Sequence, residues 1–302
     1  MTCKLVYLAR RAGTVSREDW PRTWKSHAIF ASQFPVLEAK IDWMRYCNRI
    51  DAPTLDGEAI EIDGISSGNL IQGNRIGTDL AGSANWGSQQ DGILLTNGAF
   101  DNLVGGALAG EGNEIAFSGQ GGTFTDGIEV APTAGNGNAV LGNILHDNVG
   151  QGIELDADGV LGNDAVDADS GPNDLQNFPV LTSAVSSGGN IVLAGTLDTD
   201  NPSSEYRIDF YGVPAGMEEF NSHGGGNIWL GSTQVSTNVS GDASFSLISL
   251  PVGALLPGDA VSAVATFIET PAAVGIDALA AYGETSEFAT NLLVVSSDPV
   301  LN

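Results

Sequence analysis

The stretch Gly68–Gly77, which reads GNLIQGNRIG, decides the fold because its phrases recur farther along the chain. The pattern of Asn69–Asn74 returns at Asn138–Asn143, NAVLGN, and Asn102–Gly106, NLVGG, matches the first half of both. The apolar runs in these phrases are short and are interrupted by glycine or asparagine. Both residue types tolerate the left-handed backbone conformation that sharp corners need. Very short strands separated by sharp corners are therefore expected.

A second recurring phrase gives the length of one repeat. D-G-I occurs at Asp91 and at Asp126, and it returns as Q-G-I at Gln151, so that the spacing is 35 and then 25 residues. Self-similarity in a fixed order at this spacing is typical of a solenoid. Three short strands in each coil, stacked in parallel on those of the next coil, predict a right-handed β-helix.

The aligned asparagines of the repeat add a hydrogen-bonding expectation. Asn69, Asn102 and Asn138 would form a ladder in which each side-chain amide binds the next one along the stack. The phrases resemble those of bacterial right-handed parallel β-helix repeat proteins of secreted or cell-surface type, often called PbH1 repeats. The alternative is a disordered linker rich in glycine and asparagine. The aligned isoleucine, leucine and valine residues disfavour it, because low-complexity linkers lack such spaced apolar residues.

Charge divides the chain into two parts. Nine of the 11 basic residues lie within the first fifty residues, together with four acidic ones, which gives that part a net charge of +5. The rest has only Arg75 and Arg207 against 33 acidic residues, a net charge of −31. Such an acidic body repels nucleic acid and anionic lipid, so neither is an expected partner. It attracts cations, Ca²⁺ in particular.

Two classes of segment are not expected from the sequence. No apolar run approaches the roughly 18 residues of a transmembrane helix, so membrane insertion is not predicted. The first residues, MTCKLVYLARRAG, lack the apolar stretch and cleavage site of a signal peptide. Cys3 and Cys47 both lie in the basic part, so no disulfide framework is expected in the acidic body.

Residues 1–57 predict a βαβ fragment, with a strand at Lys4–Leu8, a helix ending near Phe34 and a second strand within Ile41–Ile50. The phrases KLVYLARRAGTVSREDW, WKSHA and MRYCNRIDAPTLDG resemble the first half of the EthD family. The resemblance implies half of a ferredoxin-like domain from a dimeric α+β barrel. It also implies His27 as the one candidate catalytic residue, although the favoured interpretation is that His27 only lines the helix face. The second half of that domain is missing, so the family's activity is not carried over intact.

The segment Asp156–Asp174 predicts a metal site. Alternate carboxylates in a tight loop, supplemented by backbone carbonyls, suit the six to eight oxygen ligands of Ca²⁺. A solvated acidic linker is the alternative. Two aromatic residues on projecting loops, Trp86 and Phe124, are candidate ligand-binding residues, although either could instead hold down its own loop. The candidate metal ligands are Asp156, Asp158, Asp164, Asp167, Asp169 and Asp174.

From residue 180 the apolar runs lengthen and alternate, which predicts seven strands of an immunoglobulin-like antiparallel β-sandwich. The last of these strands is expected at Phe288–Val295. The whole chain is thus predicted to be mostly β, with a small N-terminal βαβ fragment. The expected divisions are residues 1–57 (EthD-like fragment), 58–156 (β-helix), 157–179 (Asp-rich junction) and 180–302 (sandwich).

These features predict a non-catalytic structural or binding module that is secreted or displayed on a bacterial surface. Its loops would bind a polysaccharide or a cell-surface component, and Ca²⁺ would stabilise it. One alternative is a polysaccharide lyase or glycoside hydrolase, for which Glu129 and Glu154 are stacked carboxylates at equivalent positions. The only basic residue of the predicted solenoid is Arg75, and the His-containing and Lys-containing phrases of such hydrolases are absent. A second alternative is an EthD-type protein of an oxidative degradation pathway.

Overall fold

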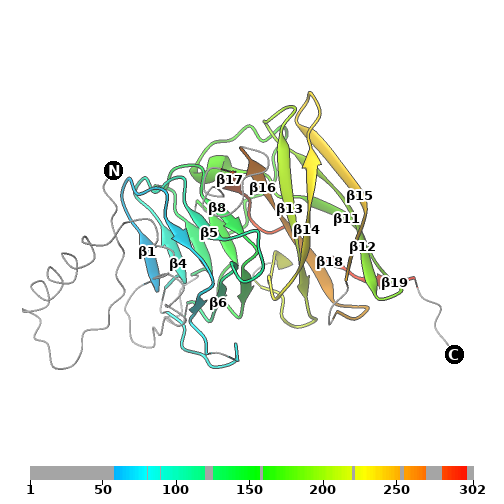
Figure 1. Cartoon of the computed structure of the whole chain (residues 1–302), viewed down its shortest axis with the longest axis horizontal. Coiled ribbons are helices and arrows are strands. Elements are labelled where there is room, and N and C mark those ends of the chain that lie inside the picture. The colour runs from blue at the N-terminus through cyan, green and yellow to red at the C-terminus, as the bar shows by residue number, and fades with distance from the viewer. Residues whose placement is uncertain are drawn as a thin grey trace, which may run out of the picture.

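The chain is mostly β, with both parallel and antiparallel sheets (Figure 1). The computed structural model describes residues 58–79, 81–88, 90–119, 125–156, 159–219, 222–251, 255–269 and 281–297. The βαβ fragment expected at residues 1–57 lies outside them. Within the described ranges, no helix has the length and apolar character needed to cross a membrane.

Three parallel sheets occupy the part of the chain up to residue 155. Each sheet takes one short strand from successive turns of the chain, so that neighbouring strands in a sheet are about one repeat apart in sequence. This arrangement is compatible with a β-helix. The three sheets consist of β1 (Ile60–Ile62), β4 (Ile93–Leu95), β7 (Ile128–Val130) and β10 (Ile153–Leu155); of β2 (Leu70–Ile71), β5 (Leu103–Gly105) and β8 (Ala139–Leu141); and of β3 (Arg75–Ile76), β6 (Glu114–Ala116) and β9 (Ile144–His146).

The stacked coils bury columns of aliphatic side chains. Ile93 pairs in register with Ile128, and Ile128 pairs with Ile153, and all three are essentially inaccessible to solvent. Because side chains of a strand alternate between its faces, a one-residue slip would turn each column out to solvent. The isoleucines at positions 93, 128 and 153, which follow D-G, D-G and Q-G, therefore hold the register by pointing inward.

The predicted asparagine ladder is present. Asn69 Nδ2 donates to Asn102 Oδ1 at 2.9 Å, and Asn102 Nδ2 donates to Asn138 Oδ1 at 2.9 Å. The ladder ends at Asn173, whose Oδ1 accepts the backbone N–H of Asn138. A second ladder runs alongside the third sheet. It consists of the residues that directly precede its strands, Asn74, Asn113 and Asn143. These amides satisfy buried backbone groups at the corners, where no strand partner is available.

Two further sheets form the antiparallel part of the chain. Most of their strands fall where the alternation of apolar residues predicts them, and their facing sides enclose a second apolar core that includes Ile208 and Phe210. One sheet has the order β15-β12-β11-β19 and the other β14-β13-β16-β17, with β18 also paired to β16. The strands are β11 (Val180–Ser187), β12 (Asn190–Asp198), β13 (Glu205–Val213), β14 (Ile228–Ser236), β15 (Asp242–Pro251), β16 (Ala260–Ile268), β17 (Tyr282–Thr285), β18 (Leu292–Leu293) and β19 (Val295–Ser296).

The prediction of one continuous strand at Phe288–Val295 is wrong. The chain instead forms β18 on one sheet and β19 on the other, and β19 pairs with β11 in parallel. Phe288 lies outside any strand, because its ring packs into the core of the stacked coils against Tyr211 at a centroid distance of 5.2 Å. The apolar run is therefore divided between two cores.

The antiparallel part closes the end of the coil stack. β17 lies next to β8 (Figure 1). The backbone N–H groups at the open edge of the last coil find acceptors there: Val140 donates to Thr285 Oγ1 at 2.9 Å, and Leu155 donates to Glu287 Oε1 at 3.1 Å. On the third sheet, Leu145 donates to the carbonyl of Gly226 at 3.1 Å. An exposed edge is a template for unwanted strand pairing, and this contact removes it.

Candidate cation site

The loop between β10 and β11 brings together three of the predicted metal ligands. Asp164, Asp167 and Asp169 each offer a carboxylate oxygen within 4.8 Å of the others. The backbone makes this possible by adopting positive φ at Val166 (60°) and Asp167 (50°). A β-branched residue rarely adopts this conformation, so the surrounding contacts must hold it.

Asparagine and glutamine side chains supply those contacts. Asn163 Oδ1 accepts the N–H of Phe178 at 3.0 Å while its Nδ2 donates to the carbonyl of the same residue at 2.8 Å. Asp167, only 5% exposed, accepts the N–H of Asn177 through Oδ1 and the Nε2 of Gln176 through Oδ2, both at 2.9 Å. The loop is thus closed on itself with its central carboxylate buried.

Strand β12 fixes the loop to the antiparallel sheets. Asp198 Oδ2 accepts the N–H of Val166 at 3.0 Å, and Asn177 Nδ2 donates to the carbonyls of both Asp164 and Asp198. The other carboxylate oxygen of Asp198, Oδ1, is inaccessible to solvent and has no hydrogen-bond partner. Asp198 and Asp200 thus add two acidic residues to the three that converge in the loop, since the charge of Asp200 acts on Asp167.

The electrostatics of the group favour neutralisation. Burial, followed by the charges of Asp200, Asp169 and Asp164, raises the pKa of Asp167 from 3.8 to about 7. Burial and the neighbouring Asp164 also raise the pKa of Asp169. The two basic residues of the described part bind other carboxylates: Arg75 pairs with Glu114, and Arg207 pairs with Asp209. A metal ion is one means of neutralising the group, because carboxylate oxygens are preferred ligands of hard cations.

The other predicted site residues lie elsewhere. Asp156 directly follows β10 with a positive φ of 72°, and its backbone N–H donates to the carbonyl of Val130. Asp174 is exposed and accepts a hydrogen bond from Asn136. Neither belongs to the group of three, and neither is assigned as a ligand. Trp86 is half-buried, and its backbone N–H donates to the carbonyl of Gly77. Asp158, Phe124 and His27 lie outside the described residues.

A second group of carboxylates was not identified as a unit from the sequence. Asp91, Asp126 and Glu129 also have oxygens within 4.8 Å of one another, and the two aspartates are each 4% exposed. The repeated D-G-I phrase was the available signal. Its aspartate has a structural role: Asp91 Oδ1 accepts the N–H of Asp126, and Asp126 Oδ1 accepts the N–H of Gln151, one coil farther on. Burial raises the pKa of Asp91.

The predicted equivalence of Glu129 and Glu154 is confirmed, since these residues are paired in register on β7 and β10. Their environments differ: Glu129 is partly exposed, whereas Glu154 is 2% exposed and faces the antiparallel part. A retaining pair of carboxylates needs access to a substrate on both side chains. Because Glu154 is buried, a substrate cannot reach its carboxylate.

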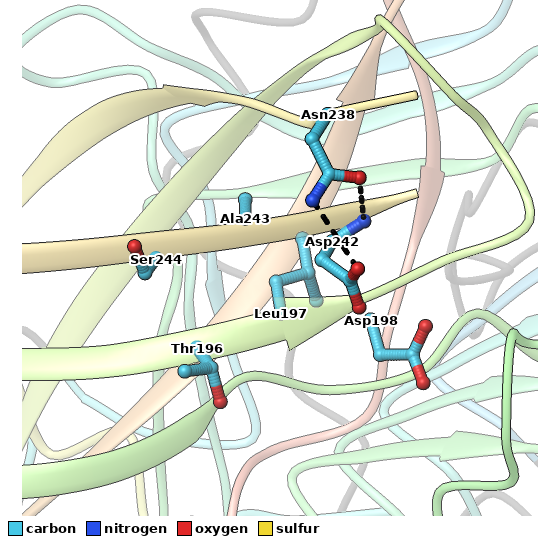
Figure 2. Close-up of a pocket in the computed structure, with 7 residues that line it drawn as sticks. All are labelled: Thr196, Leu197, Asp198, Asn238, Asp242, Ala243 and Ser244. Atoms are coloured by element: carbon cyan, nitrogen blue, oxygen red, sulfur yellow. Dashed lines mark hydrogen bonds between the residues drawn. The ribbon is translucent and has the colours of Figure 1, made fainter. Parts of the chain in front are cut away.

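Asp198, which accepts the N–H of Val166 in the loop, also lines a surface pocket (Figure 2). Asp198 and Asp242 are cross-strand partners on β12 and β15, and the side chain of Asn238 bonds both the carboxylate and the N–H of Asp242. The pocket contains hydroxyl, amide and carboxylate groups but no histidine, cysteine, lysine or arginine. Its lining residues are Thr196, Leu197, Asp198, Asn238, Asp242, Ala243 and Ser244.

Comparison of the chain with protein-family models gives no match, and comparison with curated proteins gives none either. The resemblance of residues 1–57 to the EthD family thus finds no support there.

Proposed function

We propose that the chain is a non-catalytic structural and binding module of a secreted or surface-displayed bacterial protein. In this proposal the parallel sheets are a short right-handed β-helix and the antiparallel sheets an immunoglobulin-like sandwich. The coil stack is a rigid scaffold that presents loops to a polysaccharide or another surface component. A calcium ion held by Asp164, Asp167 and Asp169 stabilises the junction between the two parts.

The observation that carries the proposal is the acidic group in the junction. Three carboxylates lie within 4.8 Å of one another, and the basic residues of the described part are bound elsewhere. Like charges this close repel one another. A divalent ion removes the repulsion within a loop that is already tied to β12 by the hydrogen bond from the Val166 N–H to Asp198.

The extent of side-chain hydrogen bonding supports a scaffold. The interior of the coil stack is filled by aliphatic columns, and asparagine ladders occupy two of its corners. A catalytic cleft would need a substrate-accessible group of acid, base or nucleophile residues. The pocket of Figure 2 has acidic residues but lacks a basic partner for them.

Calcium titration tests the junction. The full chain is melted in chelator and in Ca²⁺ at a large excess over the dissociation constant. At a hundredfold excess a single site adds about 2.7 kcal/mol of stability. Asp164→Asn should remove most of the shift. Asp174→Asn is the matched control, because it removes an exposed aspartate outside the group. A melting temperature that does not respond to Ca²⁺ in the unmodified chain would contradict the calcium site.

The non-catalytic role is tested separately with a panel of acidic and neutral polysaccharides. Retention of the chain on one of them, without a change in polymer length, is the expected result. Chain cleavage measured by size-exclusion chromatography would overturn the proposal in favour of a polysaccharide-degrading enzyme.

A further inference from the structure

Two buried carboxyl groups meet where the antiparallel part closes the last coil. Glu154 on β10 is 2% exposed, and Glu287, which follows β17, is 1% exposed. The side chain of Glu287 is within hydrogen-bonding reach of Glu154. In the part of the chain that the structure describes, the two arginines pair with other carboxylates, Arg75 with Glu114 and Arg207 with Asp209. Two buried like charges in contact are strongly unfavourable, so the pair cannot be doubly ionised at low cost.

The hydrogen bonds around the pair show where a proton is missing. Both oxygens of Glu287 accept backbone N–H groups, from Leu155 at 3.1 Å and from Leu161 at 3.0 Å. Oε2 of Glu154 accepts from Gln151 Nε2 and from the N–H of Gly159. Oε1 of Glu154 is inaccessible to solvent and has no donor. It is the only one of the four carboxyl oxygens without a hydrogen bond, and a proton placed on it could form one.

We infer that Glu154 and Glu287 share one proton, and that this proton holds the antiparallel part against the end of the coil stack. Protonated Glu154 donates to the carboxylate of Glu287, which in turn accepts the edge amides of Leu155 and Leu161. Loss of the proton places two negative charges in the contact and weakens it. The contact between the antiparallel part and the last coil is therefore a proton-dependent lock, since it is stable only while the pair keeps its proton. The inference does not depend on the calcium site.

Burial and the neighbouring negative charges outweigh the hydrogen bonds to the pair, so that the pKa values of both carboxyl groups are raised. Burial and the charge of Glu287 raise the pKa of Glu154, and Asp126 of the preceding coil raises it further. Burial likewise raises the pKa of Glu287, although the amides of Leu155 and Leu161 oppose this effect. Gln151 is the remaining side-chain partner and carries no charge. Since both pKa values lie above the ordinary 4.5, the stabilisation is complete below that pH and is lost as the pH rises through the raised values.

Unfolding equilibria of the full chain at pH 5 and pH 9, in chelator, test the lock. Glu154→Gln carries a permanent N–H donor for Glu287 in place of the proton. Each unit of pKa shift corresponds to a tenfold change in the equilibrium constant. The loss of stability between the two pH values should therefore be at least about tenfold smaller in Glu154→Gln than in the unmodified chain. Glu61→Gln is the control, because Glu61 lies in the same column of the sheet, in the first coil, and is exposed. Parallel pH profiles of Glu154→Gln and the unmodified chain would overturn the inference.

Hydrogen exchange of the unmodified chain gives a test that needs no variant. After correction for intrinsic exchange, the amides of Leu155 and Leu161 should lose protection as the pH rises. The amide of Ile93, which donates to the carbonyl of Gly127 inside the stack, should keep more of its protection. Equal loss at all three amides would contradict a lock at the junction.

Discussion

The side-chain amide of Asn102 donates a hydrogen bond to Oδ1 of Asn138 at 2.9 Å, although the two residues are 36 positions apart in the sequence. Asn102 also accepts the amide of Asn69 and donates to the carbonyl of Ser66, so it connects three turns of the chain. Each of these groups is buried or partly buried, and an unmade hydrogen bond at such a position costs more than a formed one contributes.

Asn102→Ala should accordingly destabilise the fold by about 2–4 kcal/mol, because it leaves several polar groups without partners. Asn69→Ala, at the half-buried end of the ladder, should cost no more than about 1 kcal/mol. Urea unfolding monitored by circular dichroism measures both. Equal losses in the two variants would show that the ladder contributes little to the stack.

Thr285 closes the second sheet of the stack, and its replacement tests that closure. Thr285→Val preserves the shape but removes the acceptor of the Val140 N–H and the hydroxyl partner of Thr266. We expect a loss of about 1–3 kcal/mol. Thr266→Val is the matched variant: it removes the same hydroxyl pair but leaves the acceptor of Val140 in place. We expect Thr266→Val to lose less stability in chemical denaturation. The difference between the two variants then gives the contribution of the hydrogen bond at the Val140 edge. The interpretation fails if Thr266→Val costs as much as Thr285→Val.

The coil stack could be predicted from the sequence because its information is local and repeated. Asn69, Asn102 and Asn138 lie in recognisable phrases, and the D-G-I isoleucines occur at equivalent places in successive coils. The closure of the stack could not be predicted in this way. Thr285 and Val140 are 145 positions apart, belong to no common repeat and meet only after both parts have folded.

The candidate site was predictable only in part for a similar reason. The density of aspartates between residues 156 and 174 indicated a cation-binding loop, but spacing alone does not determine which carboxylates converge. That choice is made by the positive φ of Val166 and Asp167 and by the hydrogen bonds of Asn177. The contribution of Asp198, on a strand some thirty residues farther on, left no signal in the loop itself.

Two glycines with nearly the same positive φ provide a test of close packing between coils. Gly105 has φ of 87°, and a Cβ there would lie 2.0 Å from the carbonyl oxygen of Leu141. Gly110 has φ of 84° and open space around the corresponding position. Gly110→Ala should cost about 1–2 kcal/mol from backbone strain alone. Gly105→Ala should add at least about 1–3 kcal/mol for the displaced coil. Thermal unfolding of the two variants compares these terms, and equal melting temperatures would rule out tight packing at Gly105.

Glu219, which lies between β13 and β14, gives a second prediction of pH dependence. Its side chain is 9% exposed, accepts a hydrogen bond from Asn148 Nδ2 at 3.2 Å and has an oxygen, Oε2, without a partner. Burial raises the pKa of Glu219 from 4.5 to about 8. A carboxyl group with a raised pKa in the folded state binds its proton more tightly there than in the unfolded chain. The resulting stabilisation is present in full below pH 4.5 and is lost as the pH rises through about 8.

Glu219→Gln should therefore unfold with a weaker pH dependence than the unmodified chain and should be the more stable of the two at pH 9. The difference is on the order of a few kcal/mol, since each unit of pKa shift corresponds to about 1.4 kcal/mol. Glu218→Gln is the control, because it removes the adjacent, exposed charge. Denaturant unfolding at pH 5, 7 and 9 separates the variants. If Glu219→Gln and Glu218→Gln have the same profile, the pH dependence of the junction arises elsewhere, and the Glu154–Glu287 pair is the next group to examine.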